Sequence, residues 1–288
     1  MIAALAAVVV VGGLIAGLVV TRGDGDGSDD PVAESASGGL TGGDFHSIAV
    51  DPSNPERIFV GGHQAVSEST DGGATWSEVP TLRDADAMGW VFTTDNVYVS
   101  GHPGLTVSVD RAGSFERSND GLPDTDLHAL GGTDRVLYAA GPAVGVSART
   151  EPDGPWDQRT AQAGQSFFGR ILVDPTKPET LIAADAANGV VASADGGRTW
   201  NLLPSGLVSA TWLSRSGPDG QTIVASGGAG AALSSDGGAT WEPLRIPPGA
   251  SLIELSPEDL DTMYAGIHDG ERVRVSISQD AGGTWSDS

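Results

Sequence analysis

The chain has 288 residues, a formal net charge of −23, no cysteine and a single lysine, Lys177. This acidity argues against nucleic acid or an anionic membrane surface as a partner. The absence of cysteine excludes disulfides, thiolate metal sites and a cysteine nucleophile. The length fits one large domain or two average ones, so the internal pattern has to decide the domain organisation.

The N-terminal segment predicts a membrane anchor. Residues 2–20 are all apolar or glycine, enough for a helix of about 28 Å that crosses a hydrocarbon core. The segment is longer than a typical signal-peptide core, and no small-residue cleavage site follows closely. We therefore expect a transmembrane signal anchor at residues 1–21 and an acidic flexible linker at residues 22–43, rich in Gly, Asp and Ser. The remaining domain would lie outside the cytoplasm, tethered to the membrane.

A short motif repeats through the rest of the chain. The pattern S-x-D-x-G-x-T-W runs from Ser193 to Trp200, begins again at Ser69, Ser234 and Ser278, and has two degenerate copies between them. Its aspartates fall at positions 71, 110, 153, 195, 236 and 280, which gives a period near 42. Short β-type runs repeating at this period are typical of propeller blades. Because the aspartate recurs in every copy, we interpret it as a structural part of a glycine-containing hairpin turn rather than as a catalytic carboxylate.

These observations predict one β-propeller at residues 44–288. We expect an all-β domain of six blades, each with four antiparallel strands, preceded by one transmembrane helix. In the first repeat the strands are predicted at residues 45–50, 57–61, 65–69 and 75–79. Six blades use the chain completely and leave no strand to complete the first blade. The ring is therefore expected to close through side-chain packing, unless the predicted phase is wrong by one strand.

The repeated octapeptide resembles the Asp-box, or bacterial neuraminidase repeat, of sialidases, sortilin-type receptors and photosystem II assembly propellers. Two further segments resemble exported bacterial propellers catalogued as glycosyl hydrolases: Tyr98-Val99-Ser100-Gly101-His102-Pro103 and Asp126-Leu127-His128-Ala129-Leu130. The resemblance covers about residues 44–288 and implies the propeller fold. It does not choose a function, since this fold carries both enzymes and scaffolds.

The five histidines are predicted to lie on one face of the propeller. Three of them, His63, His102 and His268, each follow the aromatic residue of a second strand by four positions. The other two, His46 and His128, directly precede first strands, and Met88 holds the same position in the second blade. All five would then surround one mouth of the central channel, where propellers bind ligands.

We therefore predict that this mouth binds a glycan, a small molecule or a divalent transition metal. Imidazole suits zinc, copper, iron and nickel, and loop carboxylates could complete the ligand shell. The alternative is that these histidines only hydrogen-bond loop carbonyls. The predicted metal ligands are His46, His63, His102, His128 and His268, and the predicted ligand-binding residues are these five with Met88, Trp90 and Arg170.

Sialidase catalysis is not expected, because Tyr98, Tyr138 and Tyr264 occupy one apolar position of the repeat and Arg170 is predicted to point into the channel alone. A glycosidase of another type would need two carboxylates about 5–10 Å apart, and the candidates are Asp84, Asp86 and Asp185. Trp90 and Trp212 could stack on a sugar or fill the space between blades. Whether the protein is an enzyme, or a scaffold for envelope proteins, stays open at this stage.

Overall fold

The computed structural model describes residues 40, 44–151, 154–217, 219–268 and 273–287. All of them belong to one compact unit, Ala36–Ser288, which is distinct from the unit Met1–Ser35. The predicted anchor and all but one residue of the predicted linker lie outside the described residues, so both stay predictions. Within the described part of the chain, no helix has the length and apolar character needed to cross a membrane.

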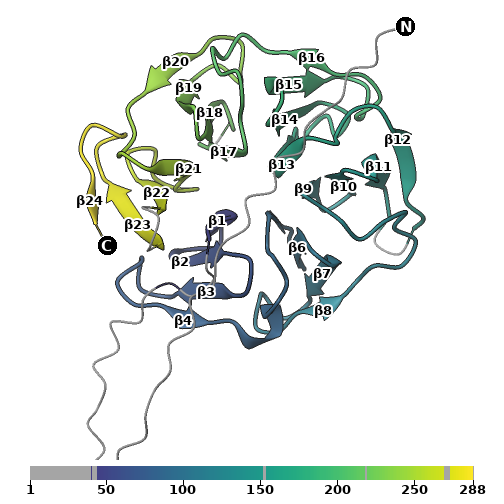
Figure 1. The fold of residues 1–288 in the computed structure, drawn as a ribbon, viewed down its shortest axis with the longest axis horizontal. Helices are drawn as coiled ribbons and strands as arrows, with labels where there is room; N and C mark the ends of the chain where they lie inside the picture. Colours follow the sequence, from purple (N-terminus) through teal and green to yellow (C-terminus); the bar gives the residue numbers. More distant parts are fainter. Residues whose placement is uncertain (1–39, 41–43, 152–153, 218, 269–272, 288) are drawn as a thin grey trace, which may run out of the picture. The chain divides into compact units, whose positions relative to one another are not determined.

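The unit Ala36–Ser288 is an all-β propeller, as predicted (Figure 1). Apart from the 3-10 helix η1 (Pro80–Leu82), its regular elements in the described residues are strands. In each repeat the first strand lies nearest the centre of the ring and the fourth lies at the outside. Every strand pairs antiparallel with the next one along the chain inside its repeat.

Four repeats form separate four-stranded sheets. The first sheet contains β1 (Ser47–Asp51), β2 (Asn54–Gly61), β3 (Val66–Ser69) and β4 (Ser77–Glu78). The second contains β5 (Gly89–Phe92), β6 (Val97–Gly101), β7 (Gly104–Ser108) and β8 (Glu116–Arg117). The last two contain β17 (Trp212–Ser216), β18 (Thr222–Gly227), β19 (Gly230–Ser234) and β20 (Glu242–Leu244), then β21 (Ala250–Leu255), β22 (Met263–His268), β23 (Val273–Ser278) and β24 (Ser286–Asp287).

The prediction of six separate four-stranded blades is wrong, because the third and fourth repeats form one eight-stranded sheet. This sheet contains β9 (Ala129–Thr133), β10 (Val136–Gly141), β11 (Gly145–Arg149), β12 (Asp157–Thr160), β13 (Phe167–Val173), β14 (Leu181–Asp185), β15 (Gly189–Ser193) and β16 (Asn201–Leu202). The two inner strands, β9 and β13, pair in parallel at Ala129 with Gly169 and at Leu130 with Arg170. The N–H of Gly169, a residue at φ +68°, donates to the carbonyl of His128 at 2.9 Å. A positive φ is accessible to glycine without steric cost, and it brings β13 against β9.

The ring closes through side-chain packing, which is the first of the two possibilities that the sequence left open. No strand pairing joins the first sheet to the last among the described residues. Instead, Leu252, Tyr264 and Val275 of the last repeat share a buried apolar cluster with residues of β1 and β2. Phe45 packs beside Gly266, where a Cβ would overlap its ring. Burial of apolar surface therefore replaces the closing strand.

The repeated turns are held by their own side chains. In the first copy, Ser69 Oγ donates to Asp71 Oδ1 at 2.8 Å and accepts from the Gly73 N–H at 2.8 Å. The backbone and hydroxyl of Thr75 donate to the two oxygens of Asp71 at 2.8 and 2.6 Å. The same bonds recur around Asp195, Asp236 and Asp280. The aspartates therefore have a structural role in the turns, as predicted.

The turn carboxylates predict a loss of stability in acid. Hydrogen bonds from the side chain and backbone of the following threonine lower the pKa of Asp71, Asp195 and Asp236 from 3.8 to about 2. A folded-state pKa below the unfolded value stabilises the fold fully above pH 3.8, and this contribution disappears as the pH falls toward 2. We expect the urea midpoint to fall between pH 4 and pH 2. A triple Asp→Asn variant at these positions should show a flatter pH dependence, and an unchanged slope would contradict this assignment.

Candidate metal centre

Seven side chains from the first three repeats meet at one end of the channel, where the first strands begin. We call them the rim cluster: Asp44, His46, His63, Asp86, His102, Asp126 and His128. Asp44, Asp86 and Asp126 hold the same place in successive repeats, each two residues before His46, Met88 or His128. The backbones of His46, Met88 and His128 each donate to a carbonyl at the end of the second strand, at 2.8, 2.8 and 2.9 Å. This shared pairing carries the three aspartates to the same edge of their sheets.

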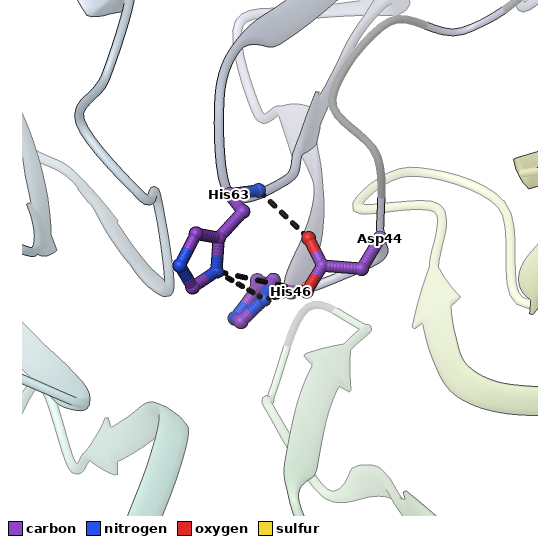
Figure 2. A group of neighbouring side chains, drawn as sticks. All are labelled: Asp44, His46 and His63. Carbon is purple, nitrogen blue, oxygen red and sulfur yellow. Dashed lines mark hydrogen bonds and ion pairs between the residues drawn. The ribbon is translucent and has the colours of Figure 1, made fainter. Parts of the chain in front are cut away.

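The first group within the rim cluster is Asp44, His46 and His63 (Figure 2). His46 Nε2 lies 2.7 Å from Asp44 Oδ2, and His63 Nδ1 lies 3.5 Å from His46 Nε2. The backbone N–H of His63 donates to Asp44 Oδ1 at 2.9 Å, which fixes the carboxylate between the two rings. The His63 side chain is 61% exposed, so the group is open to solvent on that side.

The second group is His102, Asp126 and His128. His128 Nε2 lies 2.8 Å from Asp126 Oδ1 and 3.3 Å from His102 Nε2, and His102 Nε2 also contacts Asp126 Oδ1. The ring centroids of the two histidines are 5.3 Å apart, the same separation as in the first group. Phe168 stacks on His128 at 4.8 Å and covers one face of its ring.

Asp86 lies between the two groups and is only 3% exposed. Its Oδ1 lies 3.5 Å from Nδ1 of His46 and 3.5 Å from Nδ1 of His63, and its Oδ2 lies 2.8 Å from Nδ1 of His102. Neither oxygen has a well-aligned hydrogen-bond donor among the described residues. A buried carboxylate in this state is costly unless a positive group or a donor compensates it.

The pKa shifts of Asp44 and His128 favour the forms that bind metals. Burial raises the pKa of Asp44, but hydrogen bonds from His46 and from the backbone of His63 outweigh it and lower the pKa overall. Burial lowers the pKa of His128, although Asp126 acts in the opposite direction. Carboxylate and neutral imidazole are the ligating forms of these residues.

Each group offers two imidazole nitrogens and one carboxylate oxygen within 4.8 Å of one another. Two histidines and one carboxylate form a known three-ligand set for catalytic zinc, which leaves a position for water. A metal-bound water ionises near neutral pH, so such a site can also supply a hydroxide. The geometry therefore suits a borderline transition metal better than Ca²⁺ or Mg²⁺, which require mostly oxygen ligands.

Four of the predicted ligand-binding residues lie outside the rim cluster: His268, Met88, Trp90 and Arg170. His268, at the end of β22, is exposed and belongs to neither group that could hold a metal among the described residues. Met88 is buried in the wall of the second blade. Trp90 is 1% exposed, stacks on Phe59 at 4.9 Å and donates to Ser47 Oγ at 2.9 Å. It therefore fills the space between blades and offers no face to a sugar.

Arg170 was predicted to point into the channel alone; it does border a cavity, but it is paired with a carboxylate. Its Nη1 lies 3.0 Å from Glu254 Oε1, and Trp212 Nε1 donates to Glu254 Oε2 at 3.1 Å. Trp212 is fully buried in this arrangement and is no sugar platform either. Arg170 and Glu254 border a cavity of about 710 Å³ whose lining includes the turns after the first strands, at the opposite end from the histidines.

The three candidate carboxylates for glycoside hydrolysis have different environments. Asp84 is exposed, whereas Asp86 is enclosed by imidazoles. Asp185 is buried and accepts hydrogen bonds from Ser166, the Ala187 backbone and Asn188 at 2.6–2.8 Å, which is a structural role in its loop. Tyr98, Tyr138 and Tyr264 are all buried, as predicted for core positions.

Sequence reasoning expected loop carboxylates beside the histidines but did not identify Asp44 and Asp126 as ligands. The signal was an aspartate two residues before His46, Met88 and His128, repeated at intervals of 42 and 40 residues. Glu254 was missed altogether. It lies within a β-strand among apolar residues, and only the opposing Arg170 distinguishes it.

No family model and no curated protein matches this chain. Among solved structures, the GH74 xyloglucanase from Xanthomonas campestris is 14% identical with a TM-score of 0.59, over 86% of this chain and 46% of that one. YCF48 from Cyanidioschyzon merolae is 14% identical with a TM-score of 0.53, over 86% of both chains. PorZ, a surface component of the type-IX secretion system of Porphyromonas gingivalis, is 15% identical with a TM-score of 0.56, over 86% of this chain and 33% of that one.

These similarities define the class of the protein as a β-propeller and show the fold alone, because the identities are low. The chain spans less than half the length of the GH74 structures it matches. It matches PorZ over only a third of that protein and YCF48 over most of both chains.

Proposed function

We propose that this propeller is a metal-binding protein that holds two divalent transition-metal ions, one in each group of the rim cluster. The observation that carries the proposal is the presence of two groups, each with two imidazoles and one carboxylate whose ligand atoms lie within 4.8 Å. The buried carboxylate of Asp86 between them adds negative charge that a cation would neutralise. Zinc is the expected ion, since this ligand set suits it.

Metal binding accounts for the rim cluster better than glycoside hydrolysis does. A glycosidase needs one carboxylic acid and one carboxylate facing a sugar. In the rim cluster the buried carboxylate, Asp86, faces imidazole nitrogens, and Asp185 is occupied by its own loop. The proposal therefore rests on the side chains of this chain and not on the enzymes that share its fold.

The proposal predicts that the full chain, freed of metal by a chelator, binds about two equivalents of Zn²⁺ or Co²⁺. Co²⁺ should give the visible absorption of a low-coordinate site. Each double variant, His46→Ala/His63→Ala and His102→Ala/His128→Ala, should lose about one equivalent, because it removes both imidazoles of one group. Elemental analysis and absorption titration measure both numbers.

The matched control is His268→Ala, which removes an imidazole outside the rim cluster and should leave the stoichiometry at two. If the wild-type protein retains no metal, the proposal is wrong, and the histidines serve only to hydrogen-bond the loops. Equal losses in His268→Ala and in the cluster variants would also overturn it, because the binding would then be nonspecific.

A further inference from the structure

Asp86 is the one member of the rim cluster that contacts both groups. Its first oxygen faces His46 and His63 of one group, and its second oxygen faces His102 of the other. The side chain is buried, and its nearest partners in the described chain are these imidazole nitrogens at 2.8–3.5 Å. The carboxylate therefore has no other described group to satisfy it.

In both His46 and His102, the two ring nitrogens face two different carboxylates. In His46, Nε2 lies 2.7 Å from Asp44 and Nδ1 lies 3.5 Å from Asp86. In His102, Nε2 contacts Asp126 and Nδ1 lies 2.8 Å from Asp86. Each ring thus directs Nε2 into its own group and Nδ1 toward the shared carboxylate.

A neutral imidazole carries one proton, and a metal on Nε2 requires that proton on Nδ1. Asp44 and Asp126 lie against Nε2 of these rings, where they would be metal ligands, whereas Asp86 is the carboxylate placed to accept from Nδ1. Carboxylates commonly orient metal-binding histidines in this way from behind the ring. Here a single carboxylate serves two rings that belong to different groups.

We propose that Asp86 is a positioning residue shared by the two metal groups, which orients His46 and His102 together from the Nδ1 side when their Nε2 atoms bind metal, and so couples the two sites. This inference rests on the proposed metal binding. It adds that the two sites are not independent, because both depend on the orientation and charge of one side chain.

The decisive variant is Asp86→Asn, tested in the full chain. The carboxamide has the same shape but offers an acceptor on one side and a donor on the other, so it cannot accept from both rings. Loss of such an outer carboxylate typically weakens metal binding about 10- to 100-fold. We expect a loss of that size for at least one of the two ions. Asp84→Asn, an exposed position in the same loop with the same change of charge, should bind both ions like the wild type.

The second measurement is nitrogen-15 NMR of the histidines in the Zn²⁺-loaded chain. The wild type and Asp84→Asn should show His46 and His102 protonated at Nδ1, with Nε2 bound to metal. In Asp86→Asn at least one of the two rings should lose this pattern, while circular dichroism shows that the protein is folded. Unchanged proton positions together with unchanged metal affinity in a folded Asp86→Asn protein would overturn the positioning role. A wild type that binds no metal would overturn the proposed function together with this inference, whereas a wild type that binds two ions beside an Asp86→Asn protein of unchanged affinity would overturn the positioning role alone.

Discussion

Gly101→Ala is expected to lower the free energy of unfolding by about 1–3 kcal/mol, and to disrupt the rim cluster as well. A Cβ at residue 101 would lie well under 3.0 Å from the carbonyl oxygens of Asp86 and Ala85. These are backbone atoms, so no flexible side chain can move aside. The loop that carries Asp86 would have to shift, and Asp86 already holds the uncommon φ of +47°.

The measurements for this variant are urea unfolding and Co²⁺ titration of the full chain. Gly228→Ala is the matched control, since a Cβ there meets no heavy atom within 4 Å and its φ lies outside the left-handed range. It should change the free energy of unfolding by no more than about 0.5 kcal/mol and leave metal binding intact. Equal stability and equal metal binding in the two variants would contradict the proposed packing.

Arg170→Ala is expected to destabilise the protein by about 3–5 kcal/mol at neutral pH, the largest change that we predict. Arg170 is the ion-pair partner of Glu254, whose side chain is 3% exposed. Removing the guanidinium leaves a buried carboxylate whose remaining hydrogen-bond partners among the described residues are the side chains of Trp212 and Ser214. An uncompensated buried charge costs far more than an exposed one.

The loss in Arg170→Ala should shrink as the pH falls from 7 to 5. Burial raises the pKa of Glu254 above its usual value, against the opposing effect of Arg170. A raised folded-state pKa means that the folded protein binds the proton more tightly, so stability increases as the pH falls and decreases as it rises through that pKa. This window lies above the pH range in which the turn aspartates titrate, so the two effects can be separated.

Two control variants test whether the loss of stability comes from the pair of Arg170 with Glu254. Adding Glu254→Gln to Arg170→Ala should recover part of the stability and remove the pH dependence, because no buried charge remains. Arg111→Ala, an exposed arginine that borders the same cavity, should change stability by no more than about 0.5 kcal/mol. If Arg111→Ala is as costly as Arg170→Ala, the general charge of the cavity and not the pair with Glu254 is responsible.

Most of the strand framework was predictable from local pattern. In the first repeat, the predicted second strand at residues 57–61 lies within β2, and the third, at 65–69, differs from β3 by one residue. The reason is that alternating apolar residues and glycine turns act over a few positions of the chain. The joining of the third and fourth repeats was not predictable, because it depends on Gly169 meeting Ala129 across 40 residues.

The site was predictable only in part, for the same reason. The histidines could be assigned to one end of the channel from their place in the repeat, and four of the five meet in the rim cluster. Their carboxylate partners could not be selected, since many loop aspartates were available. Trp90 and Arg170 were assigned to the wrong site, because the direction of a side chain on the first strand depends on what the neighbouring blades place beside it.

The sequence by itself determined the repeat, the four-stranded unit and the hydrogen-bonded turns. The turns depend on residues a few positions apart, and the period of the repeat can be read directly from the chain. Only the tertiary structure decided that Asp86 lies between two histidine groups and that Arg170 pairs with Glu254. Such contacts join residues 16–84 positions apart, and those of Asp86 with His46 and of Arg170 with Glu254 join different repeats. They form when the repeats pack against one another, because no local interaction brings these side chains together.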